Sequence, residues 1–429
     1  MVPPGRKVLL LEASVAAGDD LLRAAAALGV EAFVATHEDV YADYRPELKE
    51  KITDVVFTDF GDADRALDDL TAFCRTTGID GVVACWEFLS PVATLLADRL
   101  GLPGHDPARA TACRNKRLMA EAFAAHGVPA PRTLAAPDHT VLARLVRESG
   151  LGFPLVVKPA ENAASIGVSV VRGPEELPAA VRLARSETRK PSHGIVLDDT
   201  VLAQEYVDGD EFSVETVIAD GTIHHLAITA KFTTQDSRRV ETGHTVPAEL
   251  APGAHTAVLA AATRAVLALG LRNGVAHTEV KVDSRGDTKV IEVGARPPGD
   301  SIMTLVAEAT GVDEARAYLQ TALGIRPDVT PSRATAAAIR FLVPPHAGTL
   351  TRITGLPQGE HVITAVATRN PGDRVGDPQD NLQRVGWIML RAATATEADK
   401  AAAEAVNGVT VKVEVEVDGS GEGAGRDGS

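Results

Sequence analysis

The chain contains few cysteines and few aromatic residues. Its 429 residues include three cysteines, Cys74, Cys85 and Cys113, and aromatic side chains make up 4% of the total. An odd number of cysteines without paired metal-ligand spacing supports neither a disulfide framework nor a cysteine-based metal site. We therefore expect three reduced core thiols and a cytoplasmic location.

Long apolar runs and an excess of positive charge are also absent. No apolar run approaches the roughly 18 residues of a membrane-spanning helix, and the segment Met1–Gly5 leads into a strand pattern without the apolar region of a signal peptide. The formal net charge of -15 argues against a nucleic-acid partner, because phosphate backbones are bound by basic surfaces. We expect a globular protein of about two to four domains without membrane or nucleic-acid partners.

The first 105 residues alternate between short apolar runs and helical patterns. The first run is Lys7–Leu11, and it is followed by a helical pattern at 19–28 and a second run at 31–35. Alternation of this kind predicts a parallel sheet covered by helices on both faces, and we assign residues 1–105 to an N-terminal α/β domain. No G-x-G-x-x-G motif follows the first run, so a dinucleotide site is not expected.

Two further units follow in the sequence. Residues 106–330 contain a strand, a small-residue loop and a second strand around 153–171, and later a hairpin pattern at 277–296. Beyond residue 330 the pattern resets into four strand-like runs and one helix, which predicts a small α+β domain at 331–417. The tail 418–429 consists mainly of Gly, Ser and acidic residues and is predicted to be disordered.

The most informative pattern is an acidic pair in the hairpin. If residues 285–286 form the turn, Glu279 lies opposite Glu292 and Val280 lies opposite Ile291. Two carboxylates facing each other on one side of a hairpin repel unless a cation lies between them. Oxygen ligands of this kind favour Mg²⁺. The alternative is that two acidic residues simply face solvent.

Phosphoryl transfer requires cations for the phosphates, a backbone cradle and carboxylates for a metal ion. Lys158 ends a Val-Val strand, and the small residues 163–167 would let backbone N–H groups approach a phosphate. The segment 204–207 ends another strand, where a backbone edge can pair with adenine, and Glu211 can take ribose hydroxyls. Each feature alone is also explained by structure, for example by a surface lysine at a strand end.

Glu87 follows Trp86 directly after a predicted strand. Open α/β sheets bind ligands at the carboxyl ends of their strands, so Glu87 is a candidate substrate contact. An ordinary glutamate at the start of a helix is the alternative.

The order of these features carries more information than each one alone. From Lys116 and Lys158 through Glu211 to the acidic hairpin and Arg296, the chain resembles the ATP-grasp superfamily. Within it, the chain is similar to carboxylate–amine ligases related to bacterial L-amino-acid ligases. The resemblance covers roughly residues 5–415. It implies an ATP-grasp fold at 106–330 with a lid subdomain at about 130–205, a Rossmann-like domain before it, and an α+β domain after it.

The resemblance also implies roles for individual residues. ATP would be bound by Lys116, Lys158, Ser165, Ile166, Gly167, Gln204, Glu205, Tyr206, Val207 and Glu211. Glu279 and Glu292 would bind Mg²⁺, with Mn²⁺ as an alternative ion, and Arg296 would stabilise the acyl phosphate and its tetrahedral successor. Glu241, His244 and Glu87 would lie near the substrates. For His244, a loop histidine satisfied by the backbone is the alternative.

The chain departs from the family pattern at two positions. Gly294 stands where many ATP-grasp enzymes have an asparagine, so the usual third metal ligand is absent. Asp300 stands where a bulky aromatic residue limits the pocket in the best-known relatives. We expect Asp300 to line a more open or more acidic pocket that favours a substrate with an amino or guanidino group.

The predicted function is that of an ATP-dependent carboxylate–amine ligase. An acyl phosphate would be attacked by an amine to form an amide or peptide bond, with release of ADP and phosphate. The expected partners are small carboxylates and amines, foremost amino acids, and a homodimer is compatible with the resemblance. A carboxylating or carbamoyl-phosphate-synthetase-type enzyme and a non-catalytic ATP-binding module are the alternatives.

Overall fold

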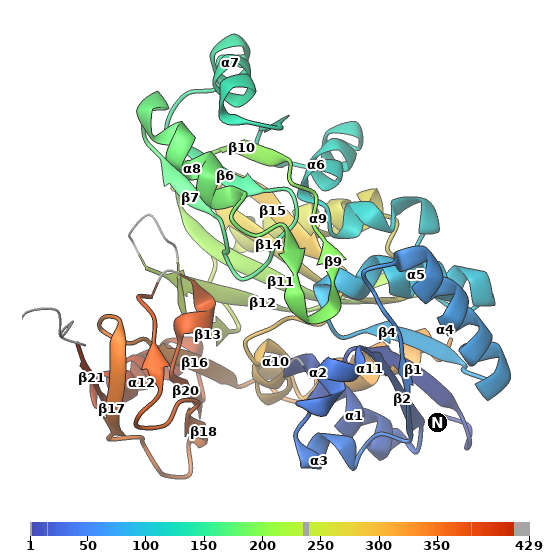
Figure 1. Ribbon diagram of the computed structural model, residues 1–429. Helices are drawn as coiled ribbons and strands as arrows, with labels where there is room; N and C mark the ends of the chain where they lie inside the picture. Colours follow the sequence, from blue (N-terminus) through green and yellow to red (C-terminus); the bar gives the residue numbers. More distant parts are fainter. Residues whose placement is uncertain (1, 15, 235–239, 379, 416–429) are drawn as a thin grey trace, which may run out of the picture.

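The computed structural model describes residues 2–14, 16–234, 240–378 and 380–415. The predicted disordered tail at 418–429 lies outside these residues. In Figure 1 the N-terminal sheet lies at the lower right, a small sheet with two helices at the top, and the C-terminal strands at the lower left. A central sheet with helices beside it connects these three parts, and the whole has the mixed α/β and α+β architecture that the sequence predicts.

The N-terminal domain is built on a parallel sheet with the strand order β3-β2-β1-β4, which confirms the predicted strand–helix alternation. Its strands are β1 Lys7–Leu11, β2 Glu31–Thr36, β3 Asp54–Phe57 and β4 Gly81–Ala84. Its helices are α1 Ala16–Leu28, α2 Glu38–Ala42, α3 Pro46–Lys49, α4 Ala63–Thr77 and α5 Ser90–Leu100. Alternate residues of β1 enter two different cores: Val8 packs on the side of α1, whereas Leu9 packs on the side of α4 and α5.

A second sheet, with the order β5-β10-β6-β7, lies in the range predicted for the lid, and we refer to it by that name. Its strands are β5 Thr133–Ala136, β6 Leu155–Pro159, β7 Ser169–Val171 and β10 Val201–Glu205. Helices α7 His139–Ser149 and α8 Leu177–Ala184 bury their apolar faces against it. Helix α6 Lys116–Ala125 precedes the lid, and residues 185–199 contain two short strands, β8 Arg189–Lys190 and β9 Ile195–Val196.

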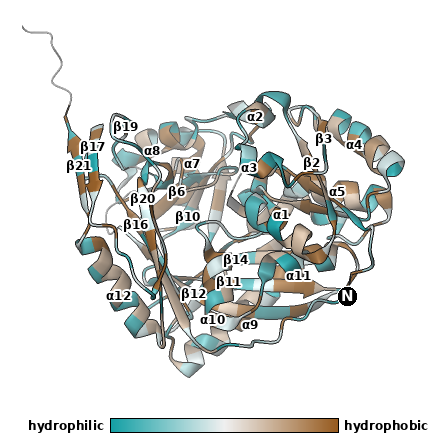
Figure 2. Cartoon of the chain, turned by 90° about the horizontal axis from the view of Figure 1, so that it is seen from below, coloured by the Kyte–Doolittle hydropathy of each residue, from teal (hydrophilic) through white to brown (hydrophobic). Residues whose placement is uncertain are grey.

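The largest sheet has eight antiparallel strands in the order β15-β14-β11-β12-β13-β16-β20-β18. They are β11 Asp210–Ala219, β12 Thr222–Thr233, β13 Glu241–Val246, β14 Gly274–Val282, β15 Thr288–Gly294, β16 Ala336–Leu342, β18 Val362–Ala367 and β20 Gly386–Ala392. The helices beside this sheet are α9 Pro252–Ala268, α10 Ile302–Thr310, α11 Glu314–Ala322 and α12 Ala395–Asn407. Figure 2 shows apolar colouring along much of β11, β14 and β16.

The C-terminal domain continues this sheet. Strand β16 forms hydrogen bonds with β13, so the change of pattern near residue 330 in the sequence is not a break in the sheet. A separate three-stranded sheet, β19-β17-β21, packs with α12 on the strands β16 and β20. Its strands are β17 Gly348–Thr354, β19 Arg374–Val375 and β21 Thr410–Glu414.

The acidic hairpin β14–β15 has the predicted register at Glu279, which lies opposite Glu292. The prediction that Val280 faces Ile291 is wrong, because a β-bulge follows Glu279 and Val280 pairs with Val290. The extra residue of the bulge lets both valines stay fully buried while Ile291 lines the pocket described below. In the described ranges, no helix is long and apolar enough to cross a membrane.

One buried carboxyl group lies in the core under the central sheet. Glu314, in the first turn of α11, is 1% exposed, and neither of its side-chain oxygens has a hydrogen-bond partner among the described residues. Burial, reinforced by the negative charge of Glu215, raises the pKa of Glu314 well above its usual value. The unfolded chain ionises this group near its usual pKa, so Glu314 reduces stability increasingly as pH rises from there toward its raised pKa.

The substitution Glu314→Met should therefore stabilise the protein. We expect a gain of about 1–3 kcal/mol in the free energy of unfolding at about pH 8, and a smaller gain at about pH 5. Chemical denaturation at both pH values measures the difference. The exposed Glu404→Met on α12 is the control, and an equal gain at both pH values would contradict the buried, protonated state of Glu314.

Candidate active site

A cavity of about 380 Å³ lies where the N-terminal domain, the lid, the central sheet and residues 381–384 meet. Every residue that the sequence assigns to the site lines this cavity except Gly167. Gly167 has a left-handed φ of +77°, and a Cβ there would lie 3.1 Å from the Cα of Ala184 in α8. It therefore shapes the loop against α8 and does not line the site.

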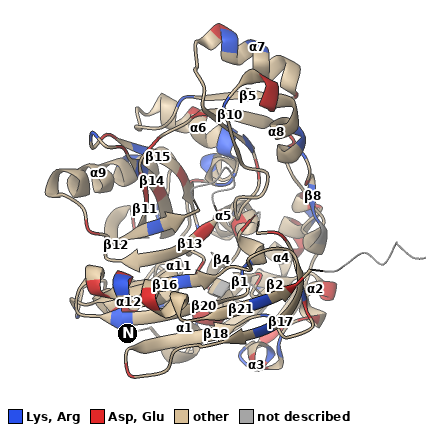
Figure 3. Ribbon diagram, turned by 90° about the vertical axis from the view of Figure 1, so that its left-hand side faces the viewer, with Lys and Arg blue, Asp and Glu red and all other residues tan. Residues whose placement is uncertain are grey.

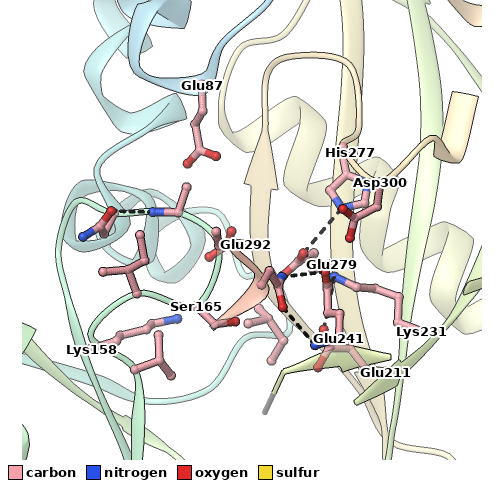
Figure 4. Close-up of a pocket in the computed structure, with 18 of the residues that line it drawn as sticks. Glu87, Lys158, Ser165, Glu211, Lys231, Glu241, His277, Glu279, Glu292 and Asp300 are labelled. Atoms are coloured by element: carbon pink, nitrogen blue, oxygen red, sulfur yellow. Dashed lines mark hydrogen bonds and ion pairs between the residues drawn. The ribbon is translucent and has the colours of Figure 1, made fainter. Parts of the chain in front are cut away.

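The loop before Gly167 has unusual backbone geometry. Ala164 and Ser165 adopt left-handed φ values of 57° and 62°, a conformation that non-glycine residues seldom take. Ser165 and Ile166 both line the cavity, and Figure 4 shows Ser165 between Lys158 and the acidic groups of the central sheet. This loop is therefore placed to cover a ligand beside Lys158.

Lys116, at the start of α6, joins several elements of the site. Its Nζ donates to the carbonyl oxygen of Asn162 at 2.7 Å and lies 3.4 Å from Glu292 Oε2 and 3.9 Å from Glu87 Oε1. Burial alone would lower the pKa of Lys116, but Glu292 and Glu87 raise it above its usual value. The positive charge of Lys116 is therefore stabilised by Glu292 and Glu87.

Lys158, the last residue but one of β6, lacks such compensation. Its side chain is buried, with 5% of the residue exposed, and no carboxylate oxygen of the described residues lies within 4.0 Å of its Nζ. Burial lowers the pKa of Lys158, and the charge of Lys116 adds to this, although Glu292 opposes it. A buried ammonium group without a paired anion is an unfavourable arrangement that a bound anion would relieve.

The sequence analysis missed Lys231, which lies at the centre of the acidic groups. Its side chain is 2% exposed, and its Nζ lies 2.5 Å from Glu279, 2.8 Å from Glu241 and 3.3 Å from Glu211. These three carboxylates come from three different strands, β11 and β13 on either side of β12 and β14 beyond β11 (Figure 4). Burial alone would lower the pKa of Lys231, but the three carboxylates raise it well above its usual value.

Two buried residues, His277 and Glu215, form a chain of polar contacts that ends at Glu279. His277, on the same face of β14, lies 3.4 Å from Glu279 Oε1 through Nε2, and its Nδ1 lies 2.8 Å from Glu215 Oε2. Burial disfavours the charged imidazole, but Glu215 and Glu279 outweigh it and raise the pKa of His277 to about 10. The alternation of His277 and Glu279 along one strand was visible in the sequence and was a signal for this contact.

Glu87 and Arg296 meet although 209 residues separate them. An Arg296 guanidinium nitrogen donates to Glu87 Oε2 at 3.0 Å, and another donates to the Pro297 carbonyl at 2.8 Å. Glu87 lines the cavity and is also the first residue of a short 3₁₀ helix, Glu87–Leu89, as the alternative interpretation expects. Burial raises the pKa of Glu87, but Lys116 and Arg296 lower it below its usual value overall.

His244 and Asp300 lie next to Glu241 on the other side of the cavity. His244 is fully buried in β13, its Nε2 lies 3.1 Å from Asp300 Oδ2, and its Nδ1 has no hydrogen-bond partner among the described residues. The alternative of a loop histidine satisfied by the backbone is therefore wrong. Asp300 also accepts two hydrogen bonds from Arg384, at 2.9 Å and 2.6 Å. The expectation of an acidic pocket is therefore wrong at this position, because a guanidinium group of the protein already neutralises Asp300.

The segment Gln204–Val207 forms another wall of the cavity, between the lid and the central sheet. The Gln204 side-chain amide donates to Thr133 Oγ1 at 3.1 Å, and the Glu205 carboxylate accepts from Lys289 at 2.7 Å. The side chain of Glu205 thus points to a partner in β15. Burial raises the pKa of Glu211, as do Glu279 and Glu241, whereas Lys231 opposes the rise.

The donor atoms fit a hard cation. Carboxylate oxygens of Glu211, Glu241 and Glu279 all lie within 4.8 Å of one another, and Glu292 faces Glu279 across the hairpin. Figure 3 shows acidic residues on β14 and β15 in the interior of the molecule. Oxygen ligands in this number are typical of Mg²⁺ and Mn²⁺ sites. In this structure the ammonium group of Lys231 supplies the positive charge among three of these carboxylates.

Three families match different parts of the sequence. Residues 22–104 match the ATP-grasp N-terminal domain, residues 151–305 match the ATP-grasp domain, and residues 340–414 match the L-amino acid ligase C-terminal domain 2. The order of these matches agrees with the order of the three structural parts described above.

Known proteins show the same relationship. The chain is 28% identical over 265 residues to carnosine synthase 1 of Homo sapiens, covering 59% of this chain and 32% of that protein. It is 28% identical over 271 residues to alanine–anticapsin ligase of Bacillus subtilis, covering 60% of this chain and 56% of the relative. The chain thus matches about a third of the length of carnosine synthase 1 and just over half of the length of alanine–anticapsin ligase.

Solved structures establish the fold. The L-amino acid ligase of Bacillus licheniformis superposes with a TM-score of 0.80 at 24% identity, covering 96% of this chain and all of that one. A biotin carboxylase domain from Hydrogenobacter thermophilus superposes with a TM-score of 0.71 at 16% identity, covering 96% of this chain and 92% of that one. The chain has the ATP-grasp fold, and its three matched parts are similar to those of ATP-grasp ligases related to the L-amino acid ligases.

Proposed function

We propose that this protein is an ATP-dependent ligase that joins the carboxylate of one amino acid to the amine of another. The γ-phosphoryl group of ATP would be transferred to the carboxylate, and the amine would attack the resulting acyl phosphate, releasing phosphate. The observation that carries this proposal is Lys158, which is buried, has no carboxylate partner among the described residues and faces an acidic hairpin across one cavity. Such a site provides positive charge for phosphates and carboxylates for a metal ion within the same enclosed space.

The ATP site would run from the lid to the hairpin. We assign the adenine contacts to Gln204–Val207, and Glu211, at the start of β11, would accept ribose hydroxyls. Lys116 and Lys158 would bind the phosphates, because both ammonium groups are buried in the cavity wall. Closure of the loop at 161–168 would exclude water, which competes with the amine for the acyl phosphate.

Glu279 and Glu292 would hold Mg²⁺, which when bound would neutralise charge on the phosphates and polarise the transferred group. Arg296 would orient the substrate carboxylate, since its guanidinium group is already fixed by Glu87 and the Pro297 carbonyl. The same donors would stabilise the oxyanion that forms when the amine attacks. Glu241 and His244 would line the amino-acid side of the cavity.

Phosphate release with Mg-ATP, measured across single amino acids and pairs of amino acids, tests the proposal. We expect release that requires two amino acids and a product whose mass equals their sum minus water. Release that depends on bicarbonate would instead favour a carboxylating enzyme. ATP binding without release for any acid and amine would favour a non-catalytic nucleotide-binding protein.

The substitution Lys158→Met tests the phosphate contact. We expect kcat/KM for ATP to fall about 100-fold, because a buried charge that pairs with phosphate would be lost. The free energy of unfolding without nucleotide should stay the same or rise, because the substitution removes an unpaired buried charge. Steady-state kinetics and thermal melts measure the two effects.

The exposed Lys400→Met on α12 serves as the matched control for this prediction. A marked loss of apo stability in Lys158→Met, or unchanged kcat/KM for ATP, would show that Lys158 has a structural role.

A further inference from the structure

The cavity ends in a wall that joins the central sheet to the C-terminal domain. Asp300 follows β15 and adopts a left-handed φ of 56°, and Arg384 precedes β20. Their bidentate ion pair spans 84 residues of sequence and leaves 18% and 16% of the two side chains exposed. Both residues line the cavity. We call Asp300, Arg384 and His244 the charge-paired wall.

Several contacts fix Arg384 in this position. Its Nε donates to the Asn381 carbonyl at 2.8 Å, and the guanidinium carbon lies 3.8 Å from the centroid of the Phe341 ring. The Asn381 side chain also forms two hydrogen bonds with Glu241. Its Oδ1 accepts from the backbone N–H of Glu241 at 2.9 Å, and its Nδ2 donates to the Glu241 carboxylate at 2.9 Å. Arg384 therefore has bidentate, stacked and backbone contacts at once, which favour a single orientation.

The ion pair between Asp300 and Arg384 has no net charge. The two charges of the ion pair cancel, and His244 Nε2 adds a third contact to Asp300 at 3.1 Å. A basic side chain would have to compete with a guanidinium group that is already in place. An acidic side chain would have to displace Asp300 from Arg384. Either event leaves a partly buried charge without its partner, which is strongly unfavourable.

Glu241, which lies beside Asp300, is already paired with Lys231 and Asn381, and four other residues that line the cavity are apolar. Pro297, Pro298, Ile302 and Leu382 all line the cavity, and Leu382 is 58% exposed at residue level, so its apolar surface is open to a ligand. The wall thus combines apolar contacts with a neutral polar surface.

We propose that the charge-paired wall selects amino acids with uncharged side chains, and that Arg384 is a specificity-determining residue supplied by the C-terminal domain. This inference rests on the proposed ligase function and names its substrate class. It also reverses the expectation from the sequence that Asp300 favours an amino or guanidino group. Asp300 turns toward Arg384, and not toward a substrate cation.

Two substitutions test the inference in opposite directions. In Arg384→Ala the carboxylate of Asp300 is released, so kcat/KM for L-arginine or L-lysine relative to L-alanine should rise by about tenfold. In Asp300→Asn the guanidinium group is released, so the ratio for L-glutamate relative to L-alanine should rise by about tenfold. The wild-type protein should prefer L-alanine to all three charged amino acids. A merely structural role of the pair would not produce opposite shifts.

Arg391→Ala, which removes an exposed arginine of β20, is the matched control. Added guanidinium ion at millimolar concentration should restore the wild-type preference in Arg384→Ala by refilling the vacated position. Wild-type turnover of charged amino acids as efficient as that of L-alanine, or the same change of preference in both variants, would overturn the inference.

Calorimetric titration with the same amino acids, in the presence of a non-hydrolysable ATP analogue, separates this inference from the proposed function. Binding of L-alanine but not L-arginine, without any turnover, would support the selection of uncharged side chains by the wall and contradict the proposed ligase function. Turnover without any preference between charged and uncharged amino acids would support the proposed ligase function and contradict the selectivity of the wall. Absence of amino-acid binding would contradict both.

Discussion

The substitution Glu292→Ala is expected to abolish ADP formation while the fold is retained. Glu292 lies opposite Glu279 in the hairpin, and its carboxylate is 3.4 Å from the ammonium group of Lys116. Removing it takes away one of the two proposed metal ligands and a charge that holds a phosphate-binding lysine. We expect kcat to fall by about 1000-fold, equivalent to about 4 kcal/mol of transition-state stabilisation.

Stability should change little in this variant. The Glu292 side chain is 23% exposed, and Lys116 keeps its hydrogen bond to the Asn162 carbonyl at 2.7 Å. The free energy of unfolding should therefore stay within about 1 kcal/mol of the wild-type value. ADP formation is followed with a coupled assay, and Asp287→Ala in the exposed turn of the same hairpin is the control. Wild-type turnover in Glu292→Ala would disprove the metal assignment.

Local sequence patterns predicted the register of the β14–β15 hairpin at Glu279 but not its bulge. The polar turn and the alternation of apolar and polar residues fixed the pairing of Glu279 with Glu292 correctly. They did not reveal the bulge one residue later, because a bulge depends on which residue the surrounding core can bury. Val280 and Val290 are both fully buried against α9 and α6, and Ile291 is displaced into the cavity instead.

The N-terminal domain was predictable for a related reason. Three of its parallel strands, β1, β2 and β4, are buried along almost their whole length, so each appears as a short continuous apolar run in the sequence. Strands β12 and β13 were not assigned from the sequence, because polar and charged residues interrupt them. Lys231 and His244 lie within these strands and directly opposite each other, and both are buried in the site.

Charge compensation was the part of the site that the sequence could not predict. Asp300 was expected to be a free acid, but its partner Arg384 comes from the C-terminal domain. Lys231 was overlooked because its three acidic partners come from three other strands, and only the sheet order brings them together. The candidate residues other than Gly167 all line one cavity, and each was identified from a motif that is local in the chain.

Removal of Lys231 should make the protein depend on a divalent cation for stability. The substitution Lys231→Met leaves the carboxylates of Glu211, Glu241 and Glu279 close together without the ammonium group that now lies within 3.3 Å of each. Their mutual repulsion in a partly buried site should lower the free energy of unfolding by about 3 kcal/mol in the absence of metal. Chemical denaturation in the presence of a chelator measures this loss.

Added Mg²⁺ should reverse much of the loss, because a cation that binds the folded state alone stabilises it by mass action. The increase in melting temperature on adding Mg²⁺ should therefore be larger for Lys231→Met than for the wild-type protein, in which Lys231 competes for the same carboxylates. Lys51→Met is the matched control, because it removes an ion pair to Asp19 of the same 2.5 Å length from a more exposed site. An equal response to Mg²⁺ in both proteins would show that the three carboxylates do not bind the ion.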